Sequence, residues 1–130
     1  MTKLKTATNI RLAIALAIVC SFIPLGLWAS YEEGEALNRQ GNREAAFAAF
    51  QAAARQGDER AFGKLGGMCL YGVGTARDFI CAYAWFTLAE EQGDRLAERF
   101  RLTASAAMTP AQIEQARQLA EDKRRELSIE

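Results

Sequence analysis

The chain has 130 residues, enough for one small domain, and half of them are hydrophobic and a quarter charged, as is ordinary for a globular protein. The 16 basic and 16 acidic residues balance, but Lys3, Lys5 and Arg11 precede the first carboxylate, so the rest of the chain has a net charge of −3. A mildly acidic domain lacks the positive surface that binds nucleic acid, so we expect no nucleic-acid partner. Helix-forming residues dominate and no segment has the pattern of a strand.

Residues 12–29 form an uncharged run, LAIALAIVCSFIPLGLWA, which follows a basic start and ends in the small residue Ala29. This pattern is typical of a secretory signal peptide, but the run is also close to the roughly 20 residues that a membrane helix needs. We therefore assign residues 1–29 to a signal peptide or an N-terminal membrane anchor, the only expected membrane contact. In either case the charge asymmetry predicts export of residues 30–130, to the periplasm or to the outer side of the inner membrane.

An internal repeat with a period of 36 residues organises the exported part: Gln56-Gly57-Asp58 recurs as Gln92-Gly93-Asp94, and Phe50 recurs as Phe86. Alanines match at the same shift, namely Ala46, Ala48, Ala53 and Ala61 with Ala82, Ala84, Ala89 and Ala97. A period of this length indicates stacked supersecondary units, none of which can bury its apolar face alone.

Glycines and candidate N-caps divide these units into helices. Glycine favours the left-handed C-terminal cap and stands after four helical runs, at Gly41, Gly57, Gly72 and Gly93. Side chains that cap N-termini follow at Asn42, Asp58, Asp78 and Asp94. We predict helices over 31–40, 43–56, 59–71, 79–92 and 95–106, and a last helix from Pro110 to about Leu127 that begins with a capping box of Thr109 and Gln112. The short connections imply antiparallel neighbours in units of about 31–57, 58–93 and 94–127.

Two cysteines, Cys69 and Cys81, flank the segment from Tyr71 to Asp78 between two predicted helices. An oxidising compartment would permit a disulfide between them. Their spacing does not fix the direction of either side chain, so small buried free thiols are the alternative interpretation.

The stretch from Leu65 to Gly93 resembles one Sel1-like repeat, a variant of the tetratricopeptide repeat with a longer loop between its two helices. The matching residues are Leu65-Gly66, Met68, Tyr71-Gly72-Val73-Gly74, Asp78, Ala82, Trp85-Phe86, Ala89 and Gln92-Gly93. The preceding unit resembles a plain tetratricopeptide repeat through Gly34, Leu37, Ala46, Phe50 and Ala53, and the last helix resembles a closing segment. The resemblance implies an all-α fold, a short α/α superhelix of antiparallel helical hairpins with a C-terminal capping helix.

The resemblance also implies a concave groove lined by the first helix of each hairpin. The positions that carry over are Tyr31, Glu35 and Asn38 in the first unit, Arg60, Gly63, Gly67 and Leu70 in the second, and Arg99 and Thr103 in the third. Such a groove would hold an extended peptide or a helix of another protein. The alternative is that these residues are the solvated face of a short solenoid. If they form a groove, Arg60→Ala together with Leu70→Ala should weaken partner capture without unfolding the domain.

The residues give no positive indication of chemistry. The chain has no histidine, and two cysteines outside residues 1–29 are too few for a closed zinc site. We therefore expect no metal, no cofactor and no catalytic residues. The favoured function is an adaptor or scaffold of a bacterial-type cell envelope. The alternatives are a self-associating structural module and a secreted hydrolase of the cysteine-rich Sel1-like type.

Overall fold

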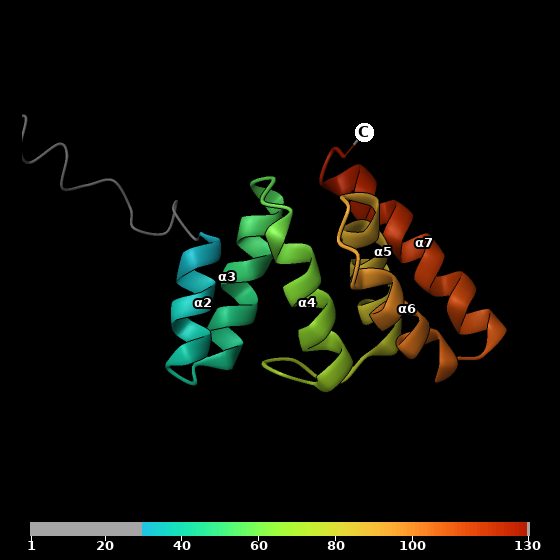
Figure 1. Ribbon diagram of the computed structural model, residues 1–130, viewed down its shortest axis with the longest axis horizontal. Coiled ribbons are helices and arrows are strands. Elements are labelled where there is room, and N and C mark those ends of the chain that lie inside the picture. Colours follow the sequence, from blue (N-terminus) through green and yellow to red (C-terminus); the bar gives the residue numbers. More distant parts are fainter. Residues whose placement is uncertain (1–29, 130) are drawn as a thin grey trace, which may run out of the picture.

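The computed structural model describes residues 30–129, and within this range the chain forms helices and no strands (Figure 1). The helices are α2 (Tyr31–Arg39), α3 (Arg43–Arg55), α4 (Arg60–Tyr71), α5 (Phe79–Glu91), α6 (Ala97–Ala106) and α7 (Pro110–Glu126). The all-α expectation is confirmed, and each helix begins and ends within two residues of its predicted bounds. The expected signal peptide or anchor lies outside the described residues, and no described helix combines the length and apolarity of a membrane crossing.

The helices are arranged as a short superhelix, with α2 at one end and α7 at the other (Figure 1). Helix α2 packs against α3 and α4 packs against α5, and the contact of α3 with α4 joins these two hairpins. Helices α6 and α7 both pack mainly on α5 rather than on each other. The second hairpin is therefore the centre of the molecule, with neighbours on both sides.

The structure agrees with the predicted C-terminal glycines at every site, but of the four predicted N-caps only Asp78 caps its helix with its side chain, and Asn42 makes no such bond. The predicted glycines after α2, α3, α4 and α5 all have positive φ angles, between 67° and 92°, a conformation that L side chains rarely adopt. Thr109 and Gln112 form the predicted capping box at α7. Helices α4 and α6 begin later than predicted because Asp58 and Asp94 start tight turns, in which their carboxylates accept hydrogen bonds from the backbone two residues on.

The same contact of a phenylalanine ring on a glycine holds together each of the first two hairpins. A Cβ atom at Gly34 would lie 2.6 Å from the ring of Phe50, and one at Gly66 would lie 2.9 Å from the ring of Phe86. Both rings are buried in the core. The glycines therefore allow the rings to reach the neighbouring helix backbone, and this close packing explains why phenylalanine recurs with the 36-residue period.

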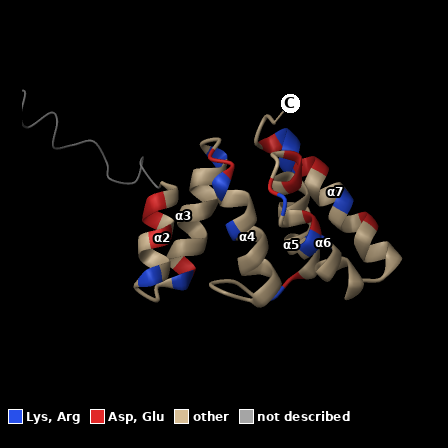
Figure 2. Ribbon diagram, viewed as in Figure 1, with Lys and Arg blue, Asp and Glu red and all other residues tan. Residues whose placement is uncertain are grey.

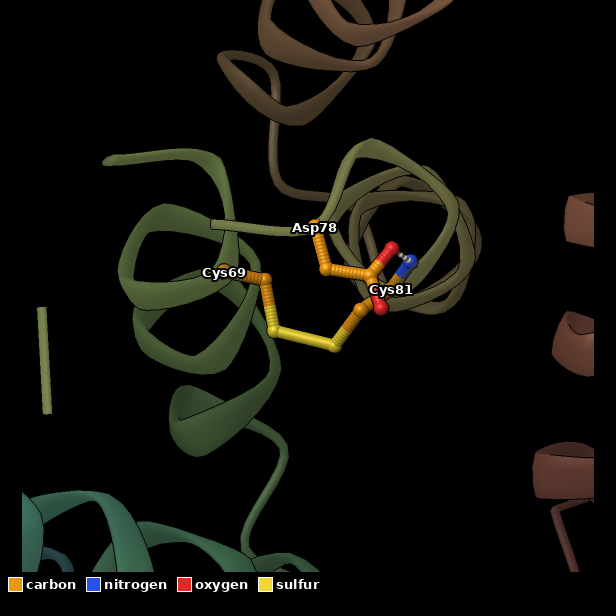
Figure 3. The surroundings of a disulfide bond; sticks show 3 residues. All are labelled: Cys69, Asp78 and Cys81. Carbon is orange, nitrogen blue, oxygen red and sulfur yellow. Dashed lines mark hydrogen bonds between the residues drawn. A yellow bond between two sulfur atoms is a disulfide. The ribbon is translucent and has the colours of Figure 1, made fainter. Parts of the chain in front are cut away.

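A disulfide joins the two helices of the second hairpin. Cys69 on α4 and Cys81 on α5 have Cα atoms 5.9 Å apart and are bonded through their sulfur atoms (Figure 3). Asp78 lies beside this bond: its N–H donates to the carbonyl of Cys69 at 2.9 Å, and its carboxylate accepts from the N–H of Cys81 at 3.0 Å. The sequence left the pairing open, and the structure has the bridge, with both ends of the loop 72–78 held at one place.

Candidate protein-binding groove

A cavity of about 350 Å³ opens between α2, α4 and α6, the first helices of the expected units. Its walls are formed by Asn38 of α2, Phe100 of α6 and several residues of α4, namely Gly63, Lys64, Gly67 and Tyr71. Its floor is apolar and is formed by Phe50, Met68, Val73 and Phe86. We call this cavity and its walls the groove.

The groove exists because α4 carries glycine where it faces the opening. A Cβ atom added at Gly67 would have no neighbour within 4 Å, so this position faces open space. Gly63 lies one helical turn earlier on the same face, and a Cβ atom there would lie 3.0 Å from Asp94 Oδ2. The absence of a side chain at Gly67 leaves open space over this face of α4, while the rings of Phe50 and Phe86 below remain buried.

Ion pairs form one edge of the groove, where α2 and α4 begin. The Arg60 guanidinium lies 2.8 Å from Glu32, 2.7 Å from Asp58 and 4.4 Å from the centre of the Tyr31 ring. Hydrogen bonds from Arg60 lower the pKa of Asp58, and backbone and Arg60 hydrogen bonds lower the pKa of Glu32.

A second ion pair stands one turn further along these helices. Lys64 Nζ lies 2.7 Å from Glu35 Oε1, and this carboxylate raises the pKa of Lys64. Both rim cations are therefore paired already, and they tie α2 to α4 across the opening.

The structure brings most of the predicted groove residues together. Tyr31, Glu35 and Arg60 form the edge of ion pairs, and Asn38, Gly63 and Gly67 line the cavity. Arg99 and Thr103 are exposed on α6 and do not line it. From α6 it is Phe100, stacked on Phe86 with ring centres 5.4 Å apart, that reaches the groove.

Leu70 was assigned to the wrong face of α4. Its side chain is only 3% exposed and belongs to the hydrophobic core. The residue that continues the face of Gly63 and Gly67 is Tyr71, four positions after Gly67 and 65% exposed. A Leu70→Ala substitution would therefore destabilise the core, and the predicted double substitution does not test binding.

Sequence reasoning also missed Lys64, Met68, Val73 and Phe100. The four-residue spacing of Gly63, Gly67 and Tyr71 could have identified the exposed tyrosine. No sequence signal shows that the loop residue Val73 reaches the cavity, since this depends on how the loop 72–78 folds back onto α3. A Cβ atom at Gly74 of this loop would lie 2.1 Å from the carbonyl oxygen of Arg43, so the loop contacts the start of α3 closely.

A larger but more polar cavity of about 570 Å³ lies over α5, between α6 and α7. Its charged groups pair with one another: Arg101 lies 2.8 Å from Glu90, and Arg124 pairs with Glu91 and Glu121. These pairs connect α6 and α7 to α5, so we interpret this cavity as structural. Within residues 30–129, no group of three or more cysteine, aspartate or glutamate side chains is placed to hold a metal ion.

A scan of known family models and a search of curated proteins gave no match for this chain. Among solved structures, the chain is similar to c5321, a protective antigen present in uropathogenic Escherichia coli strains that displays an SLR fold. The two share 27% sequence identity and superpose with a TM-score of 0.68, over 75% of this chain and 22% of c5321. The chain thus spans less than a quarter of that protein's length.

SLR stands for Sel1-like repeat, the family that the residues from Leu65 to Gly93 resemble. The chain therefore has the Sel1-like repeat fold, with six described helices packed in antiparallel pairs.

Proposed function

We propose that this protein is an adaptor of the cell envelope, which binds a peptide segment or a helix of another protein in the groove. The observation that carries the proposal is the open, apolar floor beside Gly67. Phenylalanine rings that pack tightly elsewhere in the core border a cavity here, and no described side chain fills it. A concave apolar site with a few polar groups at its rim is the usual form of a binding site.

The expected compartment is outside the cytoplasm, either the periplasm or the outer side of the inner membrane. The Cys69–Cys81 disulfide supports this, since disulfides persist mainly in oxidising compartments. The charge pattern of residues 1–29 supports it independently. Protease added to cells with a permeabilised outer membrane should digest the helical domain and leave a cytosolic control protein intact. A domain that is protected until the inner membrane is broken would contradict this localisation.

The groove can be tested with a photo-crosslinking amino acid in place of Tyr71, in cells that express the full chain. Tyr71 is exposed and lines the groove, so the replacement should be tolerated and should crosslink the bound partner. The same amino acid at Gln118, exposed on α7, is the matched control. We expect a discrete adduct from position 71 and none from position 118.

A second substitution connects the adduct to the groove itself. Gly67→Leu places a bulky side chain in open space, so it should block the groove while the helix remains intact. The adduct from position 71 should disappear in this variant, whose circular-dichroism spectrum should match that of the parent. An adduct that persists in Gly67→Leu, or equal adducts from positions 71 and 118, would show that the partner binds elsewhere.

A further inference from the structure

The charges around the groove are unbalanced, and this imbalance identifies the chemistry of the occupant. Four carboxylates lie beside the groove without lining its cavity: Glu32 and Asp58 where α2 and α4 begin, Glu35 one turn along α2, and Asp94 before α6. The first three contact Arg60 or Lys64, and Asp94 Oδ2 lies beside Gly63 in the wall. Arg60 and Lys64 neutralise two of the four carboxylate charges, so a net charge of −2 remains.

The surroundings do not cancel this excess. The exposed positions close to these carboxylates in the sequence carry Glu33, Glu59 and Glu98 against Arg95 and Arg99, which adds one more negative charge. The helix dipoles at the starts of α2 and α4 contribute about half a positive charge each, so they offset about one charge in total. The edge remains negative.

The opposite end of the first hairpin differs. Arg39, Arg43 and Glu44 lie where α2 ends and α3 begins, a net charge of +1, whereas Asp and Glu colour the upper part of α2 (Figure 2). A bound segment would therefore meet different charges at the two ends of the groove. Its cations are favoured only at the end where α2 and α4 begin.

We propose that the groove selects a cationic segment: a large apolar side chain that lies over Gly67, with lysine or arginine on one side of it, next to Glu35 and Asp94. This inference rests on the proposed function, since it assumes that the groove is the docking site. An apolar anchor gains from burial against the exposed Tyr71 and the half-buried Val73 and Phe100 that line the groove. A cation beside it relieves the unpaired negative charge and gives the segment a direction in the groove.

The experiment is a selection from a displayed library of random peptides on the full chain, immobilised in a mild detergent, with counter-selection on the Gly67→Leu variant. An enriched peptide is then synthesised, and its affinity is measured by fluorescence anisotropy for three proteins. These are the parent, the Glu32→Gln/Glu35→Gln variant and the Glu114→Gln/Asp122→Asn variant. The last removes two exposed carboxylates from α7, far from the groove, and is the matched control.

We expect the enriched peptides to carry lysine or arginine on one side of an aromatic or leucine anchor. Affinity should fall by about fivefold or more in Glu32→Gln/Glu35→Gln and stay within about twofold in the α7 control. Higher salt should weaken parent binding, because the rim charges are exposed. If the double variant unfolds, Asp94→Asn replaces it, since an asparagine oxygen can accept the same hydrogen bond from the Leu96 N–H and leaves one negative charge fewer.

The outcomes separate this inference from the proposed function. Neutral or acidic peptides that bind the parent and not Gly67→Leu would overturn the charge preference and leave the groove as the docking site. The same holds if the carboxylate variants bind a cationic peptide as well as the parent does. Peptides that bind Gly67→Leu equally well, or a selection without enrichment, would overturn both.

Discussion

Gly66 and Gly67 are neighbours on α4, yet an added methyl group has opposite consequences at the two positions. A Cβ atom at Gly66 would lie 2.9 Å from the ring of Phe86, which is held from another side by Phe100. A Cβ atom at Gly67 would meet nothing within 4 Å. The first glycine is therefore required by packing, and the second borders open space.

We expect Gly67→Ala to stabilise the domain by about 1 kcal/mol, because alanine is the better helix former and no contact is lost. Gly66→Ala gains the same propensity, but it forces a rigid, buried ring to move, and overpacking of this kind costs about 1–3 kcal/mol. Urea titrations of residues 30–130 measure both effects. If both substitutions shift the urea midpoint equally and in the same direction, the assignment of Gly67 to open space is wrong.

Arg60 gives the domain a dependence on acid pH. Its hydrogen bonds lower the pKa of Asp58 below the ordinary value of 3.8. A carboxylate with a lowered pKa stabilises the fold above its ordinary pKa, and the contribution is lost as the pH falls through the lowered value.

The prediction is that Arg60→Ala lowers the urea midpoint at neutral pH, and that the difference in midpoint between variant and parent narrows below about pH 4 as Asp58 and Glu32 become protonated. A small remainder should persist there, because the contact of Arg60 with the Tyr31 ring does not depend on these carboxylates. Since these groups are exposed, the whole effect should be modest. If the difference in urea midpoint between Arg60→Ala and the parent stays constant between pH 7 and pH 3, the ion pair of Arg60 with Asp58 contributes nothing to stability.

At the scale of helices, the glycine punctuation and the period of 36 residues predict the fold well. A glycine, which tolerates positive φ, marks the end of a helix, and the recurrence of Phe50 as Phe86 marks a repeated packing contact. Helix bounds follow from such local rules. The two late starts, at α4 and α6, also have a local cause, in the aspartate turns at Asp58 and Asp94.

The groove is less predictable because it depends on which side of a helix faces the opening. Leu70 and Tyr71 are adjacent in the sequence but point to different sides of α4, so the first is in the core and the second is exposed. The family pattern supplied the correct helix but the wrong member of this pair. Phe100 was missed for the same reason, with Arg99 chosen beside it.

The disulfide acts on one element, the α4–α5 hairpin. It joins residues 12 positions apart, and closing a loop of about this size stabilises a fold by about 3 kcal/mol in the chain-entropy model. The bond lies at the loop end of the hairpin, where the backbone of Asp78 also holds the loop to Cys69. The loop in turn supplies Val73 to the groove floor.

We expect a dithiol reductant to lower the free energy of unfolding of the parent by about 2–3 kcal/mol. Cys69→Ala/Cys81→Ala should start from that lower stability and should not respond to reductant. Urea titrations with and without the dithiol measure both. If the parent is insensitive to reductant although its thiols react quantitatively with an alkylating agent, the bridge contributes nothing to stability.

At the scale of the molecule, the second hairpin depends on α7 for cover. Trp85 of α5 is only 4% exposed, and Lys123 of α7 lies over its ring at 4.3 Å. Ala116 and Ala120 of α7 are buried as well, whereas the outer positions of this helix are charged. A terminal element with one apolar and one charged face is what a repeat array needs to end in water.

This arrangement argues against the self-associating alternative. The outer face of α7 carries Glu114, Arg117 and Asp122, and α2 at the other end exposes Glu33 and Arg39, so neither end offers an apolar surface for stacking. We expect residues 30–130 to be a monomer by size-exclusion chromatography with light scattering, and a truncation after Ala107 to associate or unfold because α5 is uncovered. A stable dimer of the intact domain that dissociates in Gly67→Leu would reverse this conclusion, because the groove would then be occupied by a second copy of the chain.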